Sequence, residues 1–362
     1  MSRYNVWFSV VMGPCCANGG VIATSGYTPR DFYAHRNCLE TFGFFTERQV
    51  EKARQLSVND TEEIYAKHSR QGIESTNYAD RWFPGRLLGI PTAPLVLFYK
   101  GDISLLGAEH TVGVVGSRQC NGEGEKACRI ISGDVARMGG VIVSGLAQGV
   151  DTVAHKACVE AGGKTVAFTG VPMDECFPRA NADFQHRLEK EHLVVSEYYS
   201  GYRYYSANFI QRNRLIAAAS DGLCVVQARK RSGSLATVNR AIEYDKPVFT
   251  VPGSIFSPTY EGSNRLLIRG EAMAVADGKT IMDYLGAVSP AEDTVQQMEK
   301  QPDIELSDSA AALLAVMDGA MFSSRMAKAT GLSAAAVKAA LTELEMYELI
   351  EKTASGEYIR LK

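Results

Sequence analysis

Short apolar runs alternate with amphipathic stretches through the middle of the chain. Most of the apolar runs end in or are followed by Gly, Ser or Thr, and apolar residues at the spacing of a helix face then follow. The runs predict strands at 112–115, 141–144, 165–168, 193–197, 222–226 and 247–251. The stretches between them predict helices at 123–138, 151–161, 181–190, 208–219 and 233–244. This alternation is typical of an α/β fold with a Rossmann-like, doubly wound sheet, which binds ligands at the carboxyl ends of its strands.

The residues before this core have a different pattern. Residues 1–75 contain short helical stretches broken at glycines, which predicts a small helical domain similar in layout to SAM or helix-hairpin-helix domains. Its apolar start, Val6 to Cys16, is assigned to a first helix and not to a signal peptide, because the basic region before it is weak. Contact with DNA through two helices joined at a glycine and simple packing of those helices both explain the pattern. The core is expected to span residues 76–287.

A polar stretch with two prolines, 288–306, predicts a linker to a separate unit at 307–362. Three helices and a hairpin are expected in that unit, at 308–317, 323–329, 333–345, 349–352 and 358–361. This layout is typical of a winged-helix domain. Six basic and seven acidic residues give the unit a charge of −1. Because phosphate contacts dominate the affinity of DNA-binding proteins, this balance favours a protein-interaction or accessory role over duplex binding.

Composition narrows the functional classes. With 362 residues, 46% of them hydrophobic, the chain suits two or three globular domains. The formal net charge is −3, so contact with nucleic acid requires a local basic patch. Eight cysteines without a C-x-x-C pair are typical of reduced thiols in a cytoplasmic protein and give no zinc-binding pattern. No apolar run is long enough to span a membrane, so we expect no membrane association.

The segment from Thr111 to Arg118 (TVGVVGSR) is the first candidate for binding chemistry. An apolar strand stops at Gly116, and Ser117 and Arg118 then lead into a helix. A helix that begins after such a turn presents backbone N–H groups to an anion, and arginine adds a bidentate donor for phosphate. A tight turn with a surface arginine explains the segment equally well. The dinucleotide fingerprint G-x-G-x-x-G and the P-loop are both absent, so no nucleotide cofactor is expected.

Basic and aromatic residues gather around the start of the helix predicted at 208–219. Arg212, Asn213 and Arg214 form an R-N-R segment, and a run of tyrosines with Phe209 precedes it. Rings and guanidinium groups in this arrangement suit single-stranded nucleic acid, whose bases stack on aromatic side chains. The residues alone leave an alternative open, in which a tyrosine-rich loop packs on the sheet and the two arginines form salt bridges.

A third segment, 226–235, ends a strand, continues with a basic triplet and opens a helix with Ser232 and Ser234. Together with 113–118 and 144–151 it gives three strand ends with Gly or Ser at a helix start, which predicts an anion site at one edge of the sheet. Four side chains could act as acids or bases: Asp151, His155, Glu197 and Glu243. Capping and packing are their favoured roles, and no catalytic or metal-binding set stands out.

The motifs of the core resemble, in their order along the chain, those of the DNA-processing protein A family (DprA, also called Smf). The matching segments are VGVVGSR (112–118), SGLAQGVDTVAH (144–155), FPRAN (177–181), SEY (196–198), QRNRLIAAAS (211–220), SGSLAT (232–237), VPG (251–253) and GSNRLLIRG (262–270). The helical N-terminal part and the winged helix also fit the layout of this family, so the resemblance covers nearly the whole chain.

The resemblance implies a Rossmann-like core that binds single-stranded DNA without sequence specificity, has no enzymatic activity and uses no cofactor. It also implies a homodimer through the core and a role in loading RecA onto incoming strands during natural transformation. The DNA-binding residues that it implies are Ser117, Arg118, Arg179, Phe209, Arg212, Asn213, Arg214, Ser232 and Ser234. Gln211 and Gln227 depart from the pattern of the family at the rim of this pocket.

Two other functions would use similar features. A nucleotide-phosphate-processing enzyme of the phosphoribohydrolase type would also have Gly-rich strand ends on a related fold, but its P-G-G-x-G-T-x-x-E signature is absent. A winged-helix transcription regulator with an effector-binding core would bind duplex DNA with sequence specificity.

Overall fold

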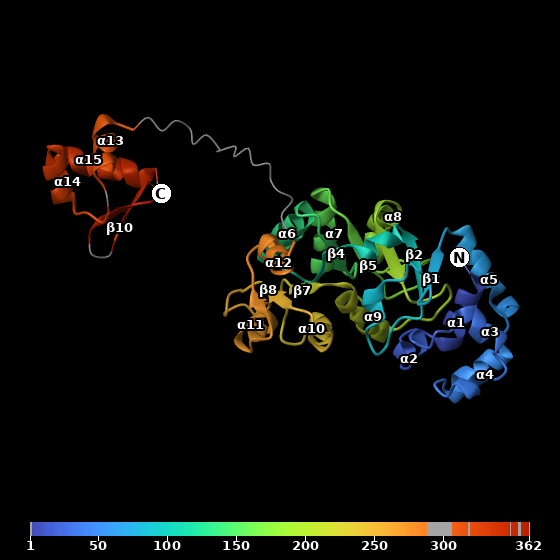
Figure 1. Ribbon diagram of the computed structural model, residues 1–362. Helices are drawn as coiled ribbons and strands as arrows, with labels where there is room; N and C mark the ends of the chain where they lie inside the picture. The colour runs from blue at the N-terminus through green and yellow to red at the C-terminus, as the bar shows by residue number, and fades with distance from the viewer. Residues whose placement is uncertain (1, 288–305, 318, 348, 354–355, 362) are drawn as a thin grey trace. The chain divides into compact units, whose positions relative to one another are not determined.

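The computed structural model divides the chain into two compact units, Met1–Pro290 and Ala291–Lys362. The structure describes residues 2–287, 306–317, 319–347, 349–353 and 356–361. A nine-stranded sheet with helices on both faces forms the centre of the first unit, and the second unit is small and has a hydrophobic core of its own (Figure 1).

The sheet of the first unit is parallel except at one edge. Its strands are β1 (Glu74–Asn77), β2 (Val96–Gly101), β3 (Thr111–Val115), β4 (Val141–Ser144), β5 (Thr165–Phe168), β6 (Leu193–Ser196), β7 (Gly222–Val225), β8 (Val248–Thr250) and β9 (Met273–Ala274). Their order is β1-β2-β6-β5-β4-β3-β7-β8-β9, and β2 pairs antiparallel with both of its neighbours. From β3 the chain builds outward to β6 and then returns to place β7 on the other side of β3. This reversal confirms the predicted doubly wound fold.

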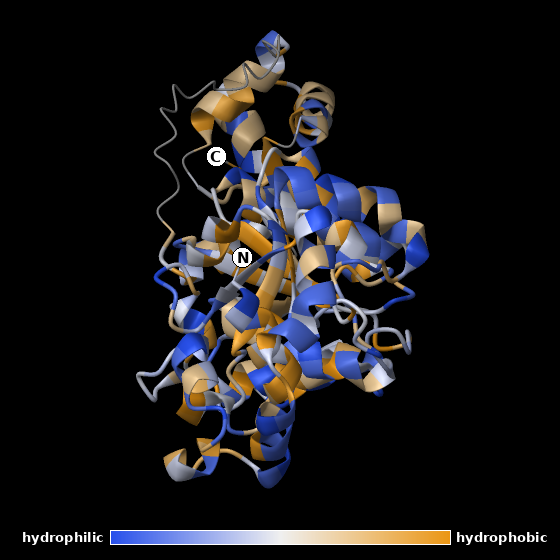
Figure 2. Cartoon of the chain, turned by 90° about the vertical axis from the view of Figure 1, so that its right-hand side faces the viewer, coloured by the Kyte–Doolittle hydropathy of each residue, from blue (hydrophilic) through white to orange (hydrophobic). Residues whose placement is uncertain are grey.

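Helices cover both faces of the sheet. The core contains α6 (Gly122–Arg137), α7 (Val150–Glu160), α8 (Ala182–Glu191), α9 (Ser206–Ala219), α10 (Ser234–Glu243), α11 (Glu261–Ile268), α12 (Gly278–Tyr284), η3 (Gly85–Leu87), η4 (Ile103–Gly107) and η5 (Arg179–Asn181). Figure 1 shows α6, α7 and α8 on one face and α9 and α10 on the other. Because side chains alternate along a strand, Val112 and Val114 pack with α6 and α7, whereas Val115 packs with α9. Apolar strands are thus enclosed between helices with polar outer faces (Figure 2).

The helical N-terminal segment packs on the sheet. Its elements are α1 (Arg3–Met12), α2 (Gly19–Ala23), α3 (Pro29–Ala34), η1 (Leu39–Phe42), α4 (Glu47–Gln55), η2 (Val58–Thr61) and α5 (Glu62–Arg70). Apolar residues of α1 and β2 belong to one continuous core. The indole Nε1 of Trp7 donates to the carbonyl oxygen of Leu56 at 2.8 Å, and Asn77 Nδ2 donates to Asn5 Oδ1 at 3.1 Å. Strand β1 begins at Glu74, so the predicted domain boundary after residue 75 falls within it.

The second unit contains three helices and a two-stranded hairpin. These elements are α13 (Asp308–Val316), α14 (Ser323–Thr330), α15 (Ala334–Met346), β10 (Ile350–Lys352) and β11 (Tyr358–Arg360). The side chains of Ser307 and Ser333 cap α13 and α15. Leu313, Met326 and Leu341 lie in the core of the unit. The elements lie where the sequence predicts them, and their interpretation as a winged-helix domain stays a prediction, as does the linker, most of which lies outside the described residues.

Across the described parts of both units, every helix is too short or too polar to cross a membrane.

Candidate functional site

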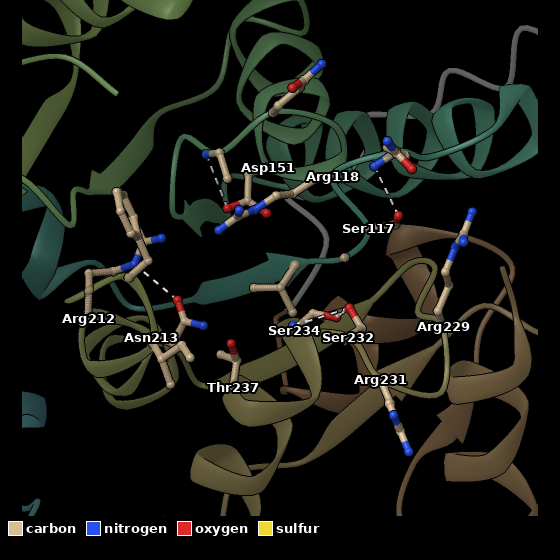
Figure 3. A pocket seen from close by; sticks show the side chains of 18 of the residues that line it. Ser117, Arg118, Asp151, Arg212, Asn213, Arg229, Arg231, Ser232, Ser234 and Thr237 are labelled. Carbon is tan, nitrogen blue, oxygen red and sulfur yellow. Dashed lines mark hydrogen bonds between the residues drawn. The ribbon is translucent and has the colours of Figure 1, made fainter. Parts of the chain in front are cut away.

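A cleft opens at the carboxyl ends of β3 and β7, where the winding of the sheet reverses (Figure 3). Its volume is about 650 Å³. The loops after β3, β4 and β7 and the first half of α9 form its walls. Its polar and aromatic lining residues are Ser117, Arg118, Gln119, Gln148, Asp151, Ser206, Phe209, Arg212, Asn213, Arg229, Arg231, Ser232, Ser234 and Thr237. Doubly wound sheets place their ligand sites at this switch point, so the cleft is the candidate site of the molecule.

Most of the residues predicted to bind DNA come together here. Seven of the nine line the cleft: Ser117, Arg118, Phe209, Arg212, Asn213, Ser232 and Ser234. The other two, Arg179 and Arg214, are not part of the lining. Arg179 is exposed on η5, which follows β5, and Arg214 lies on the buried face of α9.

Positive charge is concentrated in the cleft. Four arginines and one carboxylate belong to its lining, although the whole chain carries a formal charge of −3. Three of the arginines, Arg118, Arg229 and Arg231, are exposed and have no ion-pair partner among the residues that the structure describes; we call them the rim arginines. Their neighbour Lys230, by contrast, pairs with Glu261 at 3.3 Å. The guanidinium groups of the rim arginines are therefore available to donate hydrogen bonds to an anionic ligand, and to phosphate in particular.

The fourth arginine of the cleft, Arg212, is held by the protein itself. Its Nη1 donates to the carbonyl oxygens of Gly145, at 2.7 Å, and of Phe168, and its Nε donates to Asn213 Oδ1 at 3.2 Å. Burial lowers the pKa of Arg212, and the carboxylate of Asp151 opposes this shift. A Cβ atom on Gly145 would lie 2.5 Å from the guanidinium, so only glycine leaves room for it. Arg212 therefore adds a fixed positive charge to the floor of the cleft.

Asp151 is the carboxylate of the cleft and binds the turn between β4 and α7. Its Oδ2 accepts hydrogen bonds from the backbone N–H groups of Gly145 at 3.2 Å and Ala147 at 3.4 Å. Burial raises the pKa of Asp151 to about 6, although Arg212 and Arg118 both act to lower it. Figure 3 shows Asp151 beside Arg118. The N-cap of α7 is Gly149 and, among the described residues, receives no side-chain hydrogen bond, so Asp151 does not cap the helix as the sequence predicts; it lies in the first turn and holds the loop before it.

The opposite wall is the beginning of α10. Ser232 Oγ and Ser234 Oγ lie 2.7 Å apart, and the helix begins at Ser234. The positive end of the helix dipole is therefore close to two hydroxyl groups at the cleft. Gln227 fixes this loop, because its Nε2 donates to Asn121 Oδ1 at 2.8 Å and its Oε1 accepts from the backbone N–H of Asn121 at 3.2 Å. This departure from the family pattern thus joins the loops that follow β3 and β7.

Phe209 supplies an aromatic face to the cleft. Its ring lies beside that of Phe177, with centroids 4.9 Å apart, and meets the ring of Tyr204 edge-on at 6.5 Å. A Cβ atom on Gly170 would lie 2.6 Å from the Phe209 ring, so the glycine at the end of β5 makes room for it. Tyr198, in contrast, is buried. No tyrosine of the run lines the cleft as the structure describes it; Phe209 is the aromatic residue of this segment that does.

Arg214 has the salt-bridge role that the residues alone left open. Its Nη2 donates to both carboxylate oxygens of Glu197 at 2.8 Å, and its side chain is only 3% exposed. The two remaining acid–base candidates also lie away from the cleft. His155 is fully buried beside β5, and Glu243 pairs with Arg240 on the surface of α10.

Several lining residues were not predicted: Gln119, Gln148, Ser206, Ile210, Arg229, Arg231 and Thr237. The sequence did contain a signal for the two arginines, because a basic triplet stands between a strand end and a helix start. The glutamines and Thr237 carry no such signal. The described residues contain no group of three or more His, Cys, Asp or Glu side chains placed to hold a metal ion.

The strand order and the arginine-rich cleft together define a doubly wound α/β protein with a positively charged cleft at the switch point of its sheet. The chain belongs to the family of DNA recombination-mediator protein A, whose model matches residues 74–286. This match confirms the resemblance that the motifs indicate.

Individual relatives agree with this assignment. The DNA processing protein DprA of Streptococcus pneumoniae is 41% identical over 213 residues, which are 59% of this chain and 74% of that protein. DprA of Bacillus subtilis is 35% identical over 234 residues, which are 63% of this chain and 78% of that protein. The X-ray structure of S. pneumoniae DprA covers 78% of this chain and 98% of its own, with a TM-score of 0.67 and 32% identity. A structure of DNA processing protein A from Helicobacter pylori, which describes its single-stranded DNA binding mode, has a TM-score of 0.54 and 26% identity and covers 59% of this chain and 95% of its own.

Proposed function

We propose that this protein binds single-stranded DNA in the cleft without sequence specificity, and that it helps to load RecA onto the strand during natural transformation. The observation that carries the proposal is the presence of the rim arginines in a cleft at the switch point of the sheet. The names of the relatives, DNA processing protein and recombination-mediator protein, and the single-strand binding of the H. pylori protein support the choice of ligand.

Phosphates are the part of the strand that the rim arginines would hold. A phosphate between Arg118 and the start of α10 would accept hydrogen bonds from a guanidinium group and from the hydroxyls of Ser232 and Ser234. The helix dipole of α10 would further favour its negative charge. Phosphate contacts do not depend on the base, so they give affinity without sequence preference.

Bases would use the ring of Phe209. A base that is not paired can lie on an aromatic face, and every base has such a face, so stacking tolerates any sequence. The bases of a duplex are already stacked on one another and cannot reach the ring without being unpaired. Asn213, which also lines the cleft, offers an amide to the sugar–phosphate backbone or to a base edge. These contacts favour single strands over duplex.

The remaining parts of the proposal concern assembly and location. We infer a cytoplasmic homodimer that forms through the core, because two clefts on one strand would raise the overall affinity through effective concentration. RecA is the expected partner, and the description of the family, DNA recombination-mediator protein A, supports a role in recombination. The proposed activity is binding and handover, with no catalytic step and no cofactor.

A nucleotide-phosphate-processing enzyme is the second candidate, and Asp151 is the observation that favours it. A carboxyl group with a pKa of about 6 in a cleft is suited to proton transfer. The hydrogen bonds of Asp151 to the turn after β4 give that group a structural role instead. Incubation with nucleoside monophosphates separates the two functions, because the enzyme would release free base and the DNA-binding protein would not.

The Arg118→Ala variant tests the proposal. Removing one charge-assisted phosphate contact should weaken binding to a labelled oligothymidylate by about 1–3 kcal/mol, or about 5- to 150-fold, in a fluorescence anisotropy titration. Arg137→Ala is the matched control, because Arg137 is an exposed arginine of α6 that already pairs with Asp134 at 2.6 Å. Equal affinity of wild type and Arg118→Ala would refute the cleft assignment. The rate at which RecA assembles on the strand, with and without the protein, tests the loading step separately.

A further inference from the structure

An exposed ring stands next to the cleft but outside its lining. Phe177 lies in the loop between β5 and η5, and 46% of its surface is exposed. Its ring rests at 43° against Phe209, with centroids 4.9 Å apart, and Phe209 in turn meets Tyr204. Since Phe209 lines the cleft, the three rings form a continuous aromatic surface that leads out of the cleft past the end of β5.

A positive charge accompanies this surface. Arg179 follows Phe177 by two residues, is exposed, and has no ion-pair partner within the described part of the chain. Arg179 and a hydrogen bond with Glu175 act in opposite directions on the pKa of the Tyr204 hydroxyl, which Glu175 raises and Arg179 lowers. An exposed ring and an exposed arginine therefore lie two residues apart on the same short segment.

The order of the strands aligns this segment with the cleft. The loops after β3, β4 and β5 leave the same edge of the sheet, because these strands are parallel neighbours. Two strand spacings, roughly 10 Å, separate the β5 loop from the β3 loop that carries Arg118. A strand of nucleic acid that leaves the cleft along the edge of the sheet therefore reaches Phe177 next.

We propose that Phe177 and Arg179 form an additional nucleotide subsite, in which a base stacks on the outer face of Phe177 and its phosphate contacts Arg179. This subsite rests on the proposed function, because it extends the track of a single strand held in the cleft. It gives Arg179 a place on that track, and it makes the aromatic surface of Phe177, Phe209 and Tyr204 a path for successive bases. Stacking on a ring is the usual way in which proteins bind single strands without reading their sequence.

Affinity for oligothymidylates of two lengths tests the subsite. Phe177→Ala should weaken binding of an oligonucleotide of about 16 nucleotides by about 5- to 150-fold, the effect of losing one stacked base, and should affect one of about 4 nucleotides much less. Tyr284→Ala is the matched control. Tyr284 is 58% exposed and packs edge-on against Phe249, much as Phe177 packs on Phe209. It is far from the cleft, because the next residue, Leu285, lies beside Gly222 at the amino end of β7, whereas the cleft lies at the carboxyl ends of the strands. No loss for Phe177→Ala, or an equal loss at both lengths, would overturn the proposal.

A second pair of variants separates direct stacking from support of Phe209. Phe177→Leu keeps an apolar side chain against Phe209 but removes the aromatic face, so it should keep the unfolding temperature of the wild type and still lose affinity for the longer oligonucleotide. Phe177→Trp, in a Trp82→Phe background, should keep the affinity and show quenching of its fluorescence when the strand binds. Wild-type affinity for Phe177→Leu, or an unchanged emission for Phe177→Trp on saturation, would show that no base reaches the ring.

The Arg118→Ala titration distinguishes failure of the subsite from failure of the cleft. If the cleft binds the strand, Arg118→Ala weakens both lengths, whatever Phe177 does. If Phe177→Ala binds the oligonucleotides with the affinity of the wild type and Arg118→Ala binds them more weakly, only the proposal of the subsite is refuted. If both variants bind as the wild type does, the strand lies elsewhere and both proposals are wrong.

Discussion

The two faces of α9 use arginine in opposite ways. On the cleft side, the loops after β3 and β7 carry the rim arginines Arg118, Arg229 and Arg231, which line the cleft together with the first half of α9 and have no ion-pair partner in the described part of the chain. On the buried side, Arg214 Nη2 donates hydrogen bonds to both carboxylate oxygens of Glu197, and both side chains are almost fully buried. The same type of side chain is thus exposed and unpaired in the described part of the cleft, and paired within the fold on the other side of α9.

The buried pair also connects α9 to the helical N-terminal segment. Glu197 Oε1 also accepts a hydrogen bond from the backbone N–H of Cys15 at 3.0 Å, so one carboxylate joins α9 to the helical N-terminal segment. Arg212 is in turn clamped to the backbone after β4 and β5. With both arginines fixed, Phe209 and Asn213 are presented to the cleft from a helix that cannot rotate. Free donors, and not arginine as such, distinguish the cleft from the buried side of α9.

Loss of the buried pair should give the largest effect. Arg214→Ala leaves the Glu197 carboxylate buried without its cation, which should lower the free energy of unfolding by about 3–5 kcal/mol in a urea titration. The double variant Arg214→Leu with Glu197→Leu removes both charges, so it should be more stable than the single variant. Below its unfolding transition, Arg214→Ala should still bind single-stranded DNA. If the Arg214→Ala variant had the stability of the wild type but had lost its DNA affinity, Arg214 would be a DNA contact and its structural role would be wrong.

Removal of two rim arginines should give the next largest effect. The double variant Arg229→Ala with Arg231→Ala should lose on the order of 2 kcal/mol, about 30-fold in affinity for single-stranded DNA, without a change in stability. Two fewer phosphate contacts should also reduce the slope of log affinity against log salt by about 1.4. Arg240→Ala is the control, because Arg240 lies on α10 but pairs with Glu243 at 2.6 Å. An unchanged salt slope in the double variant would mean that the strand does not pass the rim.

The fold could be predicted because its signals are strong and local. Strands such as β4 are apolar on both faces, since helices cover both sides of the sheet, and glycine or serine ends them. Strand β1 carries no such signal. Its sequence, Glu74 to Asn77, is polar because it lies at the edge of the sheet and pairs with one neighbour, so no strand was predicted there.

The site could be predicted only as far as backbone geometry determines it. Ser117, Arg118, Ser232 and Ser234 stand at strand ends or helix starts, and the topology brings those positions together. Backbone topology does not determine which side chains of a helix face the cleft. Residues two positions apart on α9 point roughly 200° away from each other, so the two arginines of the R-N-R segment cannot both face the cleft. Only Glu197, which lies in the preceding loop, decides that this is Arg214.

The smallest expected effect concerns the carboxylate of Asp151, whose negative charge lies in the same cleft as the rim arginines. Burial raises the pKa of Asp151 to about 6, above its value of about 3.9 in an unfolded chain. The folded protein therefore holds this proton more tightly than the unfolded chain does. The carboxyl group contributes stability that is fully present below about pH 4 and is lost as the pH rises through about 6. Over the same range, ionisation of Asp151 places a negative charge at the floor of the cleft.

Affinity for single-stranded DNA should therefore rise when the pH is lowered from about 7.5 to about 5. One charge at roughly 8 Å from a phosphate is worth on the order of 1 kcal/mol, which is a change of a few-fold. Asp151→Asn should bind at pH 7.5 nearly as well as the wild type does at pH 5 and should lose this part of the pH dependence. Histidines titrate in the same range, so the difference between the two proteins, and not either curve alone, isolates Asp151. If the affinities of wild type and Asp151→Asn changed with pH in parallel, the bound phosphates would be too far from Asp151 to lie at the floor of the cleft. Among the arginines of the cleft, only the rim arginines would then contact them.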